Sequence, residues 1–118
     1  RDPVVRLILE NEEAIAIRVE LDYGRAWAEV SRALTDSGIP VVDLNRTEGW
    51  FQVDFRTEDE RSPGWFSWFR DKEAPRHSHT VNLSQRDDAI VISAERLPDY
   101  TGSRSTSDLL TQLFDYLY

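Results

Sequence analysis

The stretch from Asp22 to Gly38 constrains the fold most, because its apolar residues repeat at helical spacing while polar residues occupy the opposite side. Asp22 can accept a hydrogen bond from a free backbone N–H of the first turn, and Gly38 can adopt the left-handed conformation that often ends a helix. We therefore predict an amphipathic helix. Its apolar stripe consists of Tyr23, Ala26, Trp27, Val30, Ala33 and Leu34.

Segments rich in β-branched residues surround this helix. Residues 4–9 and 15–21 are predicted to form two strands joined by a polar turn. In the second of these strands every other residue is a large aliphatic one, which is the pattern of a sheet with one covered face and one solvated face. The residues expected on the covered face are Ile15, Ile17, Val19 and Leu21.

Two hairpins are predicted after the helix. The first joins residues 39–46 to residues 50–57, and the second joins residues 79–85 to residues 88–97. In the strand at residues 50–57 only one face has the composition of a core. We expect Phe51, Val53 and Phe55 on the core face, and Trp50, Gln52 and Asp54 on the other.

A second amphipathic helix closes the chain. Ser105 stands three residues before Asp108, which is the spacing of a capping box at a helix start. Antiparallel hairpins and two helices with apolar stripes predict a two-layer α+β fold, in which the sheet packs on the long helix and the closing helix. A helix-grip arrangement fits this order of elements best, and we expect residues 1–118 to form one such domain.

Composition limits the classes of function. The chain has 118 residues, no cysteine and a net charge of −8, so a Cys-type zinc site is excluded, and an acidic chain is not expected to bind nucleic acid. Its apolar runs are too short to span a bilayer. The first residue is Arg1, and we expect the chain to be a piece excised from a longer protein.

Recognisable catalytic motifs are missing from the sequence. No nucleophile elbow, phosphate loop, dinucleotide fingerprint or H-E-x-x-H helix occurs, and we assign no catalytic, cofactor-binding or metal-binding residue. His77 and His79 have a spacing that could bind zinc from a strand, but a tetrahedral site needs at least one more ligand, which this motif does not name. The alternative is a pair of ordinary histidines at a strand edge.

Residues 58–78 interrupt the strand pattern with proline, glycine and clustered charge. Within this excursion four aromatic residues lie among five positions, next to arginine and lysine. Such a composition is typical of a protein interface or a membrane-surface anchor, and the alternative is that the rings pack on the domain itself. We predict that this group binds a partner; its members are Trp65, Phe66, Trp68 and Phe69.

The residues from Arg25 to Phe55 resemble the helix-grip domains of BamC (NlpB), a family of lipoproteins of the outer-membrane β-barrel assembly machinery. The resemblance rests on an Ala-Trp pair and the helix stripe, followed by turn and strand positions. It covers about a quarter of the chain closely, and the rest agrees in the order of its elements. The matched positions are Ala26, Trp27, Val30, Ala33, Leu34, Gly38, Val41, Asp43, Arg46 and Gly49.

The resemblance implies a non-enzymatic accessory domain, closer to the C-terminal helix-grip domain of that family. It also implies a location on the periplasmic side of the outer membrane, other subunits of the assembly complex as partners, and membrane contact only through a lipid anchor outside this chain. It transfers no partner-binding residue, because in the family an N-terminal arm makes the described contact. The alternative function is a helix-grip carrier of an apolar small molecule, which would need a cavity between the long helix and the sheet.

Overall fold

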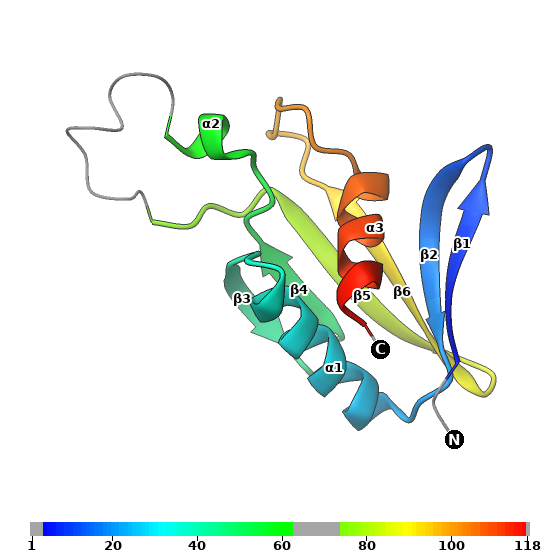
Figure 1. Cartoon of the computed structure of the whole chain (residues 1–118). Helices are drawn as coiled ribbons and strands as arrows, with labels where there is room; N and C mark the ends of the chain where they lie inside the picture. Colours follow the sequence, from blue (N-terminus) through cyan, green and yellow to red (C-terminus); the bar gives the residue numbers. More distant parts are fainter. Residues whose placement is uncertain (1–3, 63–73, 118) are drawn as a thin grey trace.

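A single six-stranded antiparallel sheet organises the computed structural model, which describes residues 4–62 and 74–117 (Figure 1). The strands are β1 (Val5–Glu10), β2 (Glu13–Val19), β3 (Val41–Asn45), β4 (Trp50–Val53), β5 (His79–Arg86) and β6 (Ala89–Arg96). Helices α1 (Tyr23–Asp36) and α3 (Thr106–Tyr116) pack on one face, and α2 (Glu58–Arg61) is a single turn. The strand order β1-β2-β6-β5-β4-β3 makes β1 and β3 the edges. The predicted α+β class, antiparallel sheet and two packed helices are confirmed.

Helix α1 begins and ends where the sequence predicts. The side chain of Asp22 accepts a hydrogen bond from the backbone N–H of Arg25 at 2.9 Å, and Gly38 has a φ of 76°. On the inner side of the helix the ring of Trp27 stacks on Phe51, with 3.9 Å between the ring centroids. The predicted stripe is confirmed at its five buried positions, Ala26, Trp27, Val30, Ala33 and Leu34.

Helix α3 starts with the predicted reciprocal cap. The Ser105 hydroxyl accepts the N–H of Asp108, and the carboxylate of Asp108 accepts the N–H of Ser105, both at 3.0 Å. The helix lies across β1, β2 and β6 and also contacts α1. Its leucines Leu109, Leu110 and Leu113 have 1% exposure or less, so α3 completes the core between the helices and the sheet.

The strand β2 contains an irregularity that the alternating pattern does not reveal. Ile8 of β1 pairs with Ala16, but the next residue, Leu9, pairs with Ala14, so Ile15 is an extra residue in a β-bulge. The bulge shifts which side chains face the core, and Ala14 is buried while Ile15 is 45% exposed. The prediction that Ile15 shares the covered face of β2 is therefore wrong.

The turn between β3 and β4 requires a glycine. Gly49 has a φ of 86°, and its carbonyl accepts the N–H of Leu83 on β5 at 2.8 Å. A Cβ at Gly49 would lie 2.5 Å from the Leu83 carbonyl oxygen. This close approach lets the β3–β4 hairpin join the sheet beside β5.

Candidate functional site

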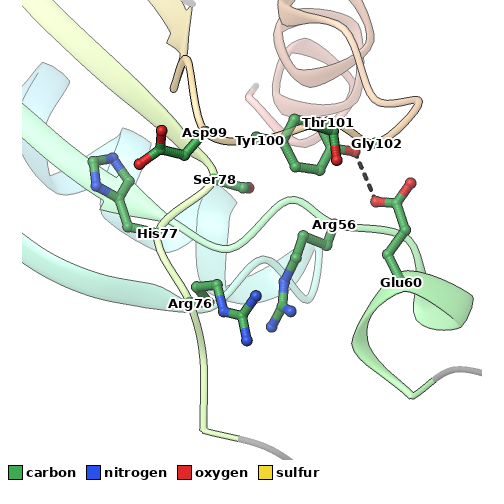
Figure 2. A pocket seen from close by; sticks show the side chains of 9 residues that line it. All are labelled: Arg56, Glu60, Arg76, His77, Ser78, Asp99, Tyr100, Thr101 and Gly102. Carbon is green, nitrogen blue, oxygen red and sulfur yellow. Dashed lines mark hydrogen bonds between the residues drawn. The ribbon is translucent and has the colours of Figure 1, made fainter.

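Three segments far apart in the sequence meet at one end of the sheet. They are the chain around α2, the residues that enter β5, and the loop between β6 and α3 (Figure 2). They border a pocket of about 330 Å³, and most of its lining residues carry polar or charged side chains. The lining residues are Arg56, Glu60, Arg76, His77, Ser78, Asp99, Tyr100, Thr101 and Gly102.

Arg56, one of the lining residues, belongs to a buried ion pair with Asp54. Asp54 and Arg56 have only 2% and 8% exposure, and the guanidinium donates from Nε and Nη2 to the two carboxylate oxygens, at 3.0 and 2.9 Å. The backbone N–H of Arg76 donates to the same carboxylate at 3.0 Å. Burial alone would raise the pKa of Asp54, but these donors hold the pKa below its ordinary value, so Asp54 is ionised.

Asp54 was expected on the solvated face of its strand, and that prediction is wrong. The reason is that β4 ends at Val53, so the alternation of faces stops one residue earlier than the sequence pattern indicates. The chain then turns inward, and a buried carboxylate requires a partner. Arg56, two residues further on, provides it.

Glu60 joins α2 to the loop after β6. Its carboxylate accepts a hydrogen bond from the hydroxyl of Tyr100 at 2.7 Å (Figure 2). It also accepts from the backbone N–H groups of Ser103 and Thr57, at 3.0 Å each. Burial would raise the pKa of Glu60, but the donors outweigh it and lower the pKa to about 2. A Cβ at Gly102 would lie 2.5 Å from the Tyr100 hydroxyl and closer still to the Glu60 carboxylate, so this arrangement requires glycine there.

His79 is fully buried beside Tyr100, with 4.9 Å between the two ring centroids. Its Nε2 lies 3.0 Å from the carbonyl of Arg104, which can only accept, so Nε2 carries the proton. Nδ1 then accepts from the Ser78 hydroxyl at 2.7 Å. Burial lowers the pKa of His79, in agreement with a neutral ring. The Ser78–His79 pair is not a nucleophile and base open to substrate, because both residues have 0% exposure.

The spacing of His77 and His79 does not produce a shared ligand set. The His77 ring bonds the Thr80 hydroxyl at 2.8 Å, while His79 is turned into the interior. Within residues 4–62 and 74–117 no group of three or more histidine, cysteine or acidic side chains could hold a metal ion. The two rings therefore have different hydrogen-bond partners, and the spacing does not bring them to a common ligand.

The predicted partner-binding residues Trp65, Phe66, Trp68 and Phe69 lie outside the described residues. The structure instead shows how the chain on both sides of them is held. On one side Glu60 is bonded to the β6–α3 loop, and on the other the N–H of Arg76 is bonded to Asp54. We call Asp54, Arg56, Glu60 and Tyr100, with the N–H of Arg76, the anchor cluster.

Sequence reasoning did not find the anchor cluster. One signal was present, because Thr57 and Glu60 have the T-x-x-E spacing of a capping box, and the structure shows both of its reciprocal hydrogen bonds. The contact from Glu60 to Tyr100 spans 40 positions and has no local signal. Since the carboxylates of Asp54 and Glu60 are already bonded, the cluster is suited to holding chain segments together rather than to acid–base chemistry.

The fold and the cluster define an α+β domain with a single sheet. In it, polar side chains hold the chain on both sides of the connection between α2 and β5. None of its described helices is long and apolar enough to cross a membrane. The chain belongs to the family described as the outer membrane protein assembly factor BamC-like C-terminal domain, whose family model matches residues 5–117. No curated protein and no solved structure matches the chain significantly.

The family match confirms the resemblance found in the sequence and extends it. The resemblance was closest between Arg25 and Phe55, whereas the family model reaches from β1 to the end of α3. The themes of outer membrane, β-barrel assembly and accessory lipoprotein therefore apply to the family of this chain.

Proposed function

We propose that this chain is a helix-grip domain that acts in outer-membrane protein assembly by binding other proteins, without catalysing a reaction. The observation that carries this proposal is the family match over residues 5–117. The domain would belong to a lipid-anchored accessory protein on the periplasmic side of the outer membrane, and its partners would be other subunits of the assembly complex. Residues 1–118 would form one domain of that protein.

The contacts between α1 and the sheet support a binding domain over a carrier of an apolar small molecule. The ring of Trp27 lies directly on Phe51, and Phe51, Val30 and Leu34 have 0% exposure. Phe55 is also buried at 2%, with Arg104 placed 4.5 Å above its ring. A lipid-sized ligand would have to displace these close-packed side chains.

We further propose that the aromatic group Trp65, Phe66, Trp68 and Phe69 contributes a contact with a partner subunit. Its composition supports this role, because tryptophan and arginine are enriched at the centres of protein interfaces. The anchor cluster adds support, since it fixes the chain on both sides of this group, at Glu60 and at Arg76. A segment whose two ends are held in place loses less conformational entropy when it binds a partner.

The test replaces Trp65 and Trp68 together by Ala in the full-length protein and measures co-purification with the assembly complex. We expect association to weaken about tenfold or more, because truncating an aromatic residue at the centre of an interface costs about 2 kcal/mol or more. The control is Leu44→Ala, which removes an exposed apolar side chain on β3. Unchanged association would remove the aromatic group from the interface, and a large fall in thermal stability would instead indicate that the rings pack on the domain.

A further inference from the structure

Among the strands of the described residues, β1 has a neighbour on one side only, which is β2. The N–H of Glu20 donates to the carbonyl of Val4 at 3.0 Å, one position beyond the pair Val5–Val19 that begins the β1–β2 register. Bonded and non-bonded pairs alternate along an antiparallel ladder. Arg6 and Ile8 of β1 therefore bond to β2. The N–H and C=O groups of Val5 and Leu7 lie in the plane of the sheet and point away from β2, toward solvent. This edge can accept a further strand.

The side chains along this edge have a clear pattern. Val5 and Leu7 are partly buried and pack against the core on the side of the helices. Arg6 lies on the other face of the sheet, directly opposite Arg18 of β2. Like charges directly opposite each other are unfavourable, and neither arginine belongs to an ion pair of the described residues.

The uncompensated arginine pair is notable in an acidic chain. The sequence holds 22 acidic and 14 basic residues, yet no carboxylate of the described residues lies within ion-pair distance of Arg6 or Arg18. A carboxylate supplied from outside the chain would compensate both charges. The edge therefore presents an apolar–basic–apolar pattern that matches an extended segment with an apolar–acidic–apolar pattern.

The opposite edge of the sheet is closed to such a segment. On β3 the outward N–H of Leu44 is already bonded to the carboxylate of Asp43 at 2.8 Å. A β-bulge at Val42 also breaks the regular spacing of β3. A strand added to this sheet would consequently meet a regular ladder only at β1.

We propose that β1 is a docking edge for an extended acidic segment of a partner protein, which adds to the sheet as a seventh, antiparallel strand. Its backbone exchanges hydrogen bonds with Val5 and Leu7, and an Asp or Glu of the segment faces Arg6 and Arg18. A second copy of this chain fits poorly, because pairing Val5 with Leu7 of that copy would place Arg6 opposite Arg6. The inference rests on the proposed function and specifies how one partner binds.

The test uses the peptide acetyl-Thr-Thr-Ile-Glu-Ile-Thr-Thr-amide as a probe, with amide hydrogen exchange of the ¹⁵N-labelled chain followed by NMR. In the free chain we expect fast exchange at Val5 and Leu7 and slow exchange at Arg6 and Ile8, because only the latter two bond to β2. The bound probe should slow exchange at Val5 and Leu7 alone. Absence of binding at millimolar probe, or binding without protection of these two amides, would overturn the proposal.

A charge exchange tests the recognition of the carboxylate. Arg6→Glu is expected to weaken binding of the probe roughly fivefold to tenfold, and a probe with Lys in place of Glu should recover most of that loss. Arg86→Glu makes the same change in net charge at an exposed position on β5 and should leave affinity within about twofold. Equal weakening by both variants would contradict a specific pairing at Arg6. These assays use the chain alone and test only the docking edge. The proposed role in the assembly complex is tested separately, by the double replacement of Trp65 and Trp68.

Discussion

The edge strands β1 and β3 end the same sheet, but they meet the solvent differently. On β3 a side-chain carboxylate occupies the outward N–H of Leu44, and a bulge at Val42 distorts the ladder. On β1 no side chain of the described residues bonds the outward groups of Val5 and Leu7. The bulge in the β1–β2 hairpin lies beyond Ile8, toward the turn of that hairpin. The regular part of the β1 edge is thus left intact.

This difference shows that protection of a sheet edge is local. An open edge is a site for unwanted pairing, and proteins usually block it with charge, bulges or short strands. Here β3 combines a bulge with a carboxylate that bonds the backbone, whereas Arg6 on β1 points to the face of the sheet and leaves the backbone accessible. The contrast favours a binding role for β1 over an accidental exposure.

The largest expected effect comes from proline at neighbouring positions of β1. Arg6→Pro removes an N–H that bonds to β2 and leaves the Arg18 carbonyl unpaired, so we expect a loss of about 1–3 kcal/mol in the free energy of unfolding. Val5→Pro removes only an outward N–H and should cost much less. Urea unfolding measures both variants. Equal losses would show that the outward and inward positions of β1 are assigned wrongly.

A smaller effect is expected from Asp43→Ala on β3. The Leu44 N–H loses its acceptor, which should cost about 0.5–1.5 kcal/mol and speed the exchange of this amide. The β3 edge would then resemble β1, and self-association should appear at high protein concentration. Glu95→Ala, an equal change in charge at an exposed residue of β6, serves as the control. If Leu44 exchanges at the same rate in both variants, the carboxylate does not protect this edge.

The smallest effect concerns the arginine pair beside the β1 edge. Arg18→Glu replaces a repulsion by an attraction across the β1–β2 pair, and we expect a gain of about 0.2–1 kcal/mol that disappears at high salt. The same variant should bind the acidic probe more weakly, since Arg6 would already have a partner. A loss of stability at low salt would indicate that another group compensates the two arginines in solution.

Features set by neighbouring residues were predicted best from the sequence. The caps of α1 and α3 depend on side chains within three positions of the helix start, and Asp22, Ser105 and Asp108 all have the predicted roles. The apolar stripe of α1 follows in the same way from its periodicity. The family was also recognisable, because the helix and the following turn carry many of its matched positions.

Features that depend on distant segments were not predicted. Ile15 follows the alternating pattern, but a bulge set by the pairing with β1 turns it to solvent. Asp54 also follows the pattern, but β4 ends before it and the carboxylate is buried with Arg56. The difference between the two edges was equally hidden, since the sequence does not give the order of strands in the sheet.

The anchor cluster also has a consequence for the length of the connection between α2 and β5. Glu60 and the N–H of Arg76 are tied to the end of the sheet by their own hydrogen bonds, and these bonds hold both sides of the connection between them in place. The entropy of closing a loop grows only with the logarithm of its length. A change in the number of residues between Glu60 and Arg76 therefore adds little to the entropy cost of closing this connection.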